Sequence, residues 1–334
     1  MATRVILYGV SSSALLVMNK IAITAIPNAS LLLFVQILST VILILLPALA
    51  GYVNVRMHPK GTVIKAYFSV ALIFLATIYS NFQVIDSIGV NSFIVLRCGT
   101  PLLICFFDWL FLDRALPRGK SFFSLLGVFL SGSSYAYLKY EEAGTGSAIE
   151  GQAIGLRGLM WSLIWLSCFV MDMIYIKHIT HVYKCTGMER TLYQNVLSIP
   201  VLLIFLCSPW ESSLPSGIIA NIDQNAAVVI SLSCVAGAVL SYTGMSLRTD
   251  LSATAFTMLG ILCKMASALL NEIFVAREPN RWSLLCISLV IVSSSFYEQA
   301  PIRDGNDLPM HRGRTKWRLG GFVATFGTGA LFLG

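Results

Sequence analysis

The chain has 334 residues, of which 56% are hydrophobic and 12% are charged, and its formal net charge at pH 7 is +7. A soluble globular protein carries about twice that share of charged residues, so the composition excludes an ordinary water-soluble domain. Apolar runs of roughly 20 residues, long enough to cross the hydrocarbon core of a bilayer, recur along the sequence and predict a polytopic membrane protein.

The apolar runs predict an all-α fold of ten transmembrane helices. The first run begins at Val5 and has no small-residue cleavage site after it, so we expect a retained span rather than a signal peptide. Seven of the eight cysteines fall within the runs and no C-x-x-C pair occurs, which argues against a disulfide framework or a metal site. The predicted spans are residues 5–26, 29–50, 62–84, 90–112, 121–138, 155–177, 190–208, 226–247, 252–274 and 282–299.

Lysine and arginine residues in the loops predict the orientation, because cytosolic loops are enriched in these residues. With a cytosolic N-terminus, sixteen basic residues fall on the cytosolic side, and the opposite side holds only Lys139, Arg157, Arg277 and Arg281. An even number of spans then places both termini in the cytosol. The basic residues are scattered over short loops, so the positive net charge is explained by topology rather than by a surface for nucleic acid.

The first and fourth predicted spans carry polar residues on one helical face. In the first span, Tyr8, Ser12 and Asn19 recur at helical spacing, and Tyr8 could stack on a flat ring or lie in an interfacial aromatic belt. In the fourth span, Arg97 is a deep cation, and Asp108 lies three turns further along the same face. Arg97 is therefore expected either to contact an anion or to form an ion pair in a gate.

The two halves of the chain resemble one another. Three pairs of segments match in the same order, at offsets of 153, 159 and 163 residues: VMNKIAITAI (17–26) with VMDMIYIKHI (170–179), FVQILST (34–40) with YQNVLSI (193–199), and LFLDRALPR (110–118) with IFVAREPNR (273–281). Each half holds five spans, and an odd number forces the second copy into the membrane upside down. Inverted repeats are typical of transporters, which bind substrate near the midplane between the repeats. The predicted units are a first repeat at 1–138, a lumenal loop at 139–154, a second repeat at 155–300 and a cytosolic tail at 301–334.

The seventh and eighth predicted spans contain further polar residues. Tyr193, Gln194 and Asn195 lie together in an otherwise apolar helix. A phenol and two carboxamides offer the donors and acceptors that suit the edge of a nucleobase, although such groups also form hydrogen bonds between helices. In the eighth span, small residues share one face and favour close helix packing, with Ser241 as a residue that could instead face a ligand.

The ninth span carries Lys264 at the centre of FTMLGILCKMASALLNEIF, where inserting an ammonium costs about 3 kcal/mol. One helical face carries a stripe of small and polar residues: Thr257, Gly260, Lys264, Ser267 and Asn271. A packing seam explains the small residues but not the ammonium. Lys264 could instead pair with a buried carboxylate, Asp172 or Glu272, or it could face an aqueous cavity and bind an anion. The interpretation as an anion site is favoured.

At LYQN (192–195) and GILCK (260–264), the sequence resembles the FYNN and GALNK motifs of the GDP-sugar transporters, a branch of the nucleotide-sugar transporters in the drug/metabolite transporter superfamily. The segments SSSALLVMNKIAI, VNSFIVLRCGTPLL, MDMIYIKHI and LSATAFTMLGILCK extend the resemblance over nearly the whole chain and look most like the plant-type branch. Leu192 and Gln194 stand where FYNN has Phe and its first Asn, and Cys263 stands where GALNK has Asn.

The resemblance implies a Golgi antiporter, not an enzyme, that exchanges a cytosolic GDP-sugar of the GDP-mannose, GDP-fucose or GDP-galactose class for lumenal GMP. It implies that Tyr193 and Asn195 contact guanine and that Gly260 and Lys264 contact the diphosphate or the sugar. No cofactor and no nucleic acid are expected; membrane lipid, the GDP-sugar and GMP are the expected partners, and a homodimer is left open. The predicted substrate-binding residues are Tyr8, Asn19, Arg97, Tyr193, Gln194, Asn195, Ser241, Gly260, Lys264 and Ser267.

Three other functions share part of this pattern. A phosphate-sugar translocator of the same superfamily usually has adjacent Lys and Arg in the ninth span, whereas here Met265 follows Lys264. A carrier for a UDP-sugar would share most of the same features. A membrane-embedded transferase would need acids or histidines clustered at one membrane face. All four histidines lie in or beside predicted cytosolic loops, and no H-E-x-x-H occurs.

Overall fold

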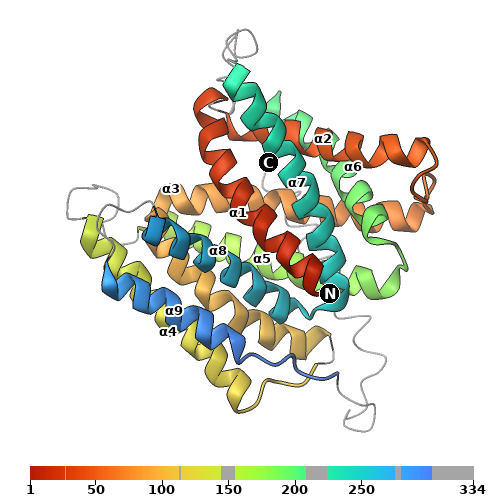
Figure 1. The fold of residues 1–334 in the computed structure, drawn as a ribbon. Coiled ribbons are helices and arrows are strands. Elements are labelled where there is room, and N and C mark those ends of the chain that lie inside the picture. Colours follow the sequence, from red (N-terminus) through yellow and green to blue (C-terminus); the bar gives the residue numbers. More distant parts are fainter. Residues whose placement is uncertain (27, 113, 144–154, 208–223, 275–279, 303–334) are drawn as a thin grey trace.

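The computed structural model describes the chain apart from residues 27, 113, 144–154, 208–223, 275–279 and 303–334, and shows a bundle of helices (Figure 1). Most of the predicted tail, from residue 303 onward, and most of the predicted lumenal loop lie outside the described residues. The described part contains no β-strand, only an isolated bridge between Arg114 and Ile302. The helices are α1 (Ala2–Ala25), α2 (Ala29–Leu49), α3 (Gly61–Phe111), α4 (Lys120–Ala143), α5 (Leu156–Val182), α6 (Gly187–Leu206), α7 (Gln224–Asp250), α8 (Ala253–Phe274) and α9 (Arg281–Ser295).

Six of the described helices contain stretches long and apolar enough to cross a membrane: Ala29–Leu49, Gly61–Phe111, Lys120–Glu142, Leu156–Val182, Gln224–Asp250 and Ala253–Leu270. The outer faces of the bundle expose many large apolar side chains, including Leu46, Phe123 and Ile204. Apolar exposure on this scale is expected where lipid rather than water surrounds a protein. For the described residues, the all-helical class and the presence of several membrane spans are confirmed.

The long helix α3 is broken at Gly89. As one straight helix its 51 residues would extend about 76 Å, more than twice the thickness of a bilayer core of about 30 Å. Gly89 has φ 77° and ψ 166°, a conformation that glycine adopts readily because it has no Cβ. The break separates two helical halves at 61–88 and 90–111, close to the predicted spans 62–84 and 90–112.

A second tight junction joins α7 to α8, with only Leu251 and Ser252 between them. The Ser252 hydroxyl accepts a hydrogen bond of 3.0 Å from the backbone N–H of Ala255. Asp108, near the end of α3, accepts bonds from the backbone N–H and the hydroxyl of Thr254, at 3.0 and 2.6 Å. These bonds satisfy N–H groups that the start of α8 would otherwise leave unpaired, and they attach α8 to α3.

Helices from the two halves of the chain pack against one another, so the halves do not form two separate bundles. The main contacts are those of α3 with α5, α1 with α7, α4 with α9, and α2 with both α6 and α7 (Figure 1). At the centre, the rings of Phe93 of α3 and Trp165 of α5 pack edge-to-face, with centroids 4.8 Å apart. This interleaving leaves the middle of the bundle lined by helices of both halves.

Ion pairs lie at the two ends of the helices. At one end, Arg4 of α1 pairs with Asp250 of α7, and Arg56 pairs with Glu189 at the start of α6, each at 2.9 Å. At the other end, Lys139 of α4 lies 3.0 Å from Glu272 of α8. The helix α4 extends through Lys139 to Ala143, five residues beyond the predicted span, so the start of the predicted loop is helical.

Candidate functional site

A cavity of about 330 Å³ lies inside the bundle, between α1, α2, α3, α5, α6, α7 and α8. This volume is within the range of small-molecule sites. Phe74, Phe169 and Phe256 supply aromatic wall, and a few polar groups converge on the same space. The polar and charged residues in the lining are Tyr8, Gln36, Thr40, Thr77, Arg97, Asp172, Gln194, Asn195, Ser241, Arg248 and Thr257.

The structure brings most of the predicted site residues to this cavity, although they come from five helices. Tyr8, Arg97, Gln194, Asn195, Ser241 and Gly260 all line it. The predicted residues that are not part of the lining are Asn19, Tyr193, Lys264 and Ser267.

The carboxamides of α6 form one wall. Asn195 donates hydrogen bonds of 2.7 Å to the Thr191 carbonyl and 3.2 Å to the Ser241 hydroxyl, which ties α6 to α7. The Gln194 side-chain oxygen is buried and has no hydrogen-bond partner among the described residues. A buried acceptor without a partner is destabilising by about 1–3 kcal/mol, so Gln194 is ready to accept a bond from a ligand or from water.

Arg97 brings a guanidinium group into the cavity. Its guanidinium carbon lies 6.0 Å from the centroid of the Phe93 ring and 5.8 Å from that of Phe169. No carboxylate lies within ion-pair distance of it in the described part of the chain. Asp108, the partner considered from the sequence, instead accepts from Thr254. In this conformation Arg97 and Asp108 form no ion pair, and both roles predicted for Arg97, contact with an anion and a pair in a gate, stay predictions.

Lys264 lies one helical turn beyond Gly260 on α8, and its side chain is exposed. Neither predicted acidic partner reaches it, because Asp172 pairs with Arg248 at 3.0 Å and Glu272 pairs with Lys139. Within the described residues Lys264 has no ion pair or side-chain hydrogen bond, so the prediction of a structural pair is wrong. Lys264 is placed beside the cavity rather than in its lining.

Gly260 leaves open space in front of the α8 backbone. A Cβ atom added there would meet no atom within 4 Å, so a ligand could approach the main chain at this turn. Phe256, one turn before Gly260 on α8, packs against the Tyr8 ring of α1, with ring centroids 5.5 Å apart. Arg97 and Arg248 line the same cavity as Tyr8.

Two predicted site residues form contacts between helices instead. The Ser267 hydroxyl lies 2.6 Å from that of Ser13, which joins α8 to α1. The Asn19 side-chain oxygen accepts a bond of 2.7 Å from Gln36, which also donates to Ser233 at 3.2 Å. In this conformation Ser267 and Asn19 therefore hold neighbouring helices together and do not line the cavity. The Asn271 side chain lies outside the described part of the structure.

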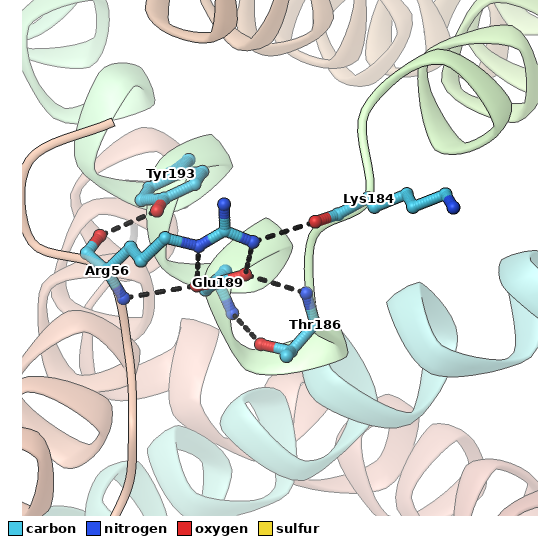
Figure 2. A network of polar contacts seen from close by, with 5 residues as sticks. All are labelled: Arg56, Lys184, Thr186, Glu189 and Tyr193. Atoms are coloured by element: carbon cyan, nitrogen blue, oxygen red, sulfur yellow. Dashed lines mark hydrogen bonds and ion pairs between the residues drawn. The ribbon is translucent and has the colours of Figure 1, made fainter. Parts of the chain in front are cut away.

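Tyr193 is not among the residues that line the cavity and instead joins the polar contacts around Arg56 (Figure 2). Its hydroxyl donates a bond of 2.6 Å to the backbone carbonyl of Arg56, and its ring packs edge-on against Tyr67 at 5.6 Å. The expected contact of Tyr193 with guanine is not possible in this arrangement, because the phenol is already engaged at the end of the bundle. Asn195, two residues later, points to a different side of α6 and reaches the cavity.

The contacts around Arg56 join the α2–α3 connection to the start of α6. Arg56 donates to the Glu189 carboxylate at 2.9 Å and to the Lys184 carbonyl at 2.8 Å (Figure 2). Glu189 and Thr186 also form a capping box that begins α6. Burial by itself would raise the pKa of the Glu189 carboxyl, but the bonds from Thr186 and Arg56 outweigh it, so this pKa lies below its usual range.

Arg248 is the main cavity residue that the sequence analysis missed. It follows directly after the predicted end of the eighth span at 247, where the sequence predicts a loop, whereas α7 continues to Asp250. Its guanidinium carbon lies 4.9 Å from the centroid of the Phe256 ring. A signal was present in the spacing, because Ser241, Gly244 and Arg248 follow one another at steps of three and four residues on one helical face.

Comparison with known proteins identifies relatives over most of the chain. No family model matches. A GDP-fucose transporter from Arabidopsis thaliana is 29% identical over 304 residues, which are 89% of this chain and 84% of that protein. The GDP-mannose transporter GONST3 of the same plant is 24% identical over 305 residues, covering 90% and 78%, and a GDP-mannose transporter of Kluyveromyces lactis is 27% identical over 273 residues, covering 80% of each. The resemblance carried by the motifs is thereby confirmed, and the chain is related over most of its length to the GDP-sugar transporters.

Proposed function

We propose that this protein is a nucleotide-sugar antiporter that carries a GDP-sugar across the Golgi membrane into the lumen in exchange for GMP. The observation that carries the proposal is the composition of the cavity. Two guanidinium groups, Arg97 and Arg248, line it with one carboxylate, Asp172, and Lys264 follows one helical turn after the lining residue Gly260. A space of this kind has an excess of positive charge in the interior of a membrane protein, which suits an anionic ligand.

The diphosphate would bind to this positive charge. It carries two negative charges and cannot cross hydrocarbon unaided, since each unpaired charge in a low-dielectric medium is costly. Neither Arg97 nor Lys264 has a carboxylate partner in the described part of the chain. A bound anion would supply the missing negative charge, so the free energy gained on binding is expected to be largest for the phosphates.

The nucleobase would bind to the α6 wall. Gln194 supplies an acceptor without a partner, and Asn195 and Ser241 present polar groups beside it. Guanine has donors and acceptors along one edge, which complementary carboxamides can satisfy. Tyr8 also lines the cavity, packs against Phe256 and offers a ring for stacking.

The helix packing supports two inverted five-helix repeats, provided that α3 counts as two helices divided at Gly89. If the second repeat copies the first, α1 corresponds to α5, α2 to α6, the two halves of α3 to α7 and α8, and α4 to α9. The contact of α3 with α5 then corresponds to the contacts of α1 with α7 and α8, and the contact of α2 with α7 corresponds to that of α3 with α6. The contact of α4 with α9 corresponds to itself. The tight turn at Gly89 corresponds to the turn at Ser252, which lies 163 positions later, the offset of the third sequence match.

The positive charge of the cavity favours exchange of two ligands over one-way transport. A loaded cavity has its cations neutralised and can reorient as the two repeats rock around the site. An empty cavity keeps unpaired positive charge away from bulk water during the same movement, which raises the barrier. Return with GMP in the cavity is therefore faster than return without a ligand.

Orientation has a direct test. We propose that both termini are cytosolic and that the connection after α4 is lumenal, from the strong bias of basic residues. Glycosylation tags inserted near Gly146 and near Lys184 should be modified only at the first position. Modification near Lys184 would reverse the assignment.

Uptake of labelled nucleotide-sugars into proteoliposomes tests the function. Vesicles preloaded with GMP should accumulate a GDP-sugar, and vesicles without GMP should accumulate much less. A panel of GDP-mannose, GDP-fucose, GDP-galactose, UDP-galactose and a triose phosphate separates the alternatives. Uptake of the UDP-sugar or of the triose phosphate in preference to every GDP-sugar would overturn the proposal.

A further inference from the structure

The ion pair between Asp172 of α5 and Arg248 of α7 lies in the wall of the cavity. One carboxylate oxygen lies 3.0 Å from a guanidinium nitrogen, and the side chains of Asp172 and Arg248 are only 5% and 15% exposed. The Arg248 group also lies over the Phe256 ring. Both residues are lining residues, so a ligand that fills the cavity meets the pair directly.

The pair is incomplete on both sides. The second oxygen of Asp172 is buried and has no hydrogen-bond partner in the described part of the chain. Arg248 uses one nitrogen in its bond to Asp172, whereas arginine and carboxylate often form two parallel bonds. None of the Arg248 nitrogens is both buried and unpartnered, so the donors not used by Asp172 remain accessible to a ligand.

Asp172 is the single acid among the described residues that line the cavity. Arg97, the other lining cation, has aromatic neighbours and no carboxylate in ion-pair distance among the described residues. Asp172 thus provides a negative charge for one guanidinium in a cavity whose other charged lining residues are arginines. A phosphate group has the same charge sign as a carboxylate, and two of its oxygens can likewise accept a pair of parallel hydrogen bonds from a guanidinium.

From this geometry we propose that Asp172 is a displaceable counter-ion, which holds Arg248 in the empty cavity and yields it to a phosphate of the bound nucleotide. Arg248 is then a phosphate-binding residue, and Asp172 lowers the affinity for anions by competing for it. The inference rests on the proposed function, because it names the residues that receive the phosphates. A pair that only held α5 to α7 would leave anion affinity unchanged.

Removal of the acid should therefore tighten anion binding selectively. In Asp172→Asn, the dissociation constants of GMP and of inorganic pyrophosphate should fall by about tenfold, and that of guanosine, which has no phosphate, should stay the same. In Arg248→Gln, binding of both anions should weaken by a similar factor. The double variant should resemble Arg248→Gln, since the benefit of removing Asp172 requires Arg248.

The double variant also protects the test against misfolding. Either single change leaves one charge buried without its partner, whereas the double change removes both and is usually tolerated. Relative to the unmodified protein, the double variant should bind GMP and pyrophosphate about tenfold more weakly and guanosine equally well. The matched control is Asp86→Asn, which removes an acid from an exposed pair with Arg157 outside the cavity and should change none of the three affinities.

Ligand-induced thermal stabilisation of the purified full chain in detergent measures all three probes. Unchanged anion affinity in both Asp172→Asn and the double variant overturns the counter-ion proposal, because the pair is then only structural. If pyrophosphate follows the predicted pattern but GMP binds no better than UMP, the counter-ion proposal stands and the guanine-nucleotide function fails. If neither anion stabilises the unmodified protein, both proposals are overturned.

Discussion

The Tyr193 hydroxyl donates a hydrogen bond to the backbone carbonyl of Arg56, 2.6 Å away, while Asn195, two residues later on the same helix, lines the cavity. These two motif positions therefore have different surroundings, because residues two positions apart on an α-helix point about 200° apart around its axis. Tyr193 belongs to the contacts that hold the α2–α3 connection against α6 (Figure 2). Asn195 belongs to the site.

The first prediction concerns Tyr193→Phe. The change removes the bond to the Arg56 carbonyl but keeps the ring against Tyr67, so the free energy of unfolding should fall by about 1 kcal/mol. Competition by GMP should remain within twofold of the unmodified protein. Thermal unfolding and ligand competition measured on the same preparation check both parts. A folded variant of unchanged stability that no longer binds GMP would show that Tyr193 contacts the base.

The second prediction concerns Asn195→Ala. The Asn195 amide lies at the cavity and bonds to Ser241, so its loss should weaken competition by GMP at least about tenfold while protein abundance changes little. The comparison with Tyr193→Phe controls for general damage to α6. With the unmodified protein, GMP should compete better than UMP; equal competition would mean that the α6 wall does not select guanine.

The third prediction concerns Lys264→Ala. The helix should insert and fold, since removing a charge from the centre of a span makes insertion easier, but stabilisation by GMP should be lost. Lys264→Arg should also weaken binding, because a planar guanidinium does not replace a compact ammonium. The melting temperatures of Lys264→Ala, Lys264→Arg and the unmodified protein, each measured with and without GMP, test this prediction.

A matched lysine provides the control for that test. Lys139 is paired with the buried Glu272, so Lys139→Ala should lower stability by about 1–3 kcal/mol and keep the shift with GMP. The value is below that for a fully buried pair because Lys139 is partly exposed. Lys264→Ala that behaves like Lys139→Ala would exclude a role for Lys264 in binding.

The fourth prediction concerns the break in α3. Gly89→Ala places a Cβ on a residue with φ 77°, which should cost about 1–3 kcal/mol of stability. Gly61→Ala is the control, since a Cβ there meets no atom within 4 Å and the residue has no positive φ. Gly61→Ala should be neutral or stabilise by up to about 1 kcal/mol. Equal stability of the two variants would argue against the turn at Gly89.

The fifth prediction concerns the pH dependence of the contacts at Glu189. The pKa of its carboxyl is lowered in the folded protein, so its contribution to stability is present above the ordinary glutamate pKa of about 4.3 and is lost as the pH falls through the lower folded value. The difference in melting temperature between the unmodified protein and Glu189→Gln should therefore be constant from about pH 5 upward and shrink below about pH 4. A difference that shrinks between pH 5 and pH 7 would contradict the lowered pKa.

Several features were predictable from the sequence because they are local. The length and apolar character of a span depend on its own residues, so the helical class and most helix bounds follow from them. The stripe on α8 needs only the helical period, and Thr257 and Gly260 do lie together at the cavity. A single ammonium amid apolar residues marks Lys264 without any knowledge of its neighbours.

The tertiary structure decided which polar residue pairs with which. Asp172 was a plausible partner for Lys264 by sequence, but α5 packs so that its carboxylate meets Arg248 of α7 instead. Periodicity likewise places Tyr193 and Asn195 on different sides of α6 but could not show which of them faces the cavity, since α6 has contacts on more than one side. Side-chain partners depend on the rotation and depth of each helix against its neighbours, and those are set by packing between segments far apart in the chain.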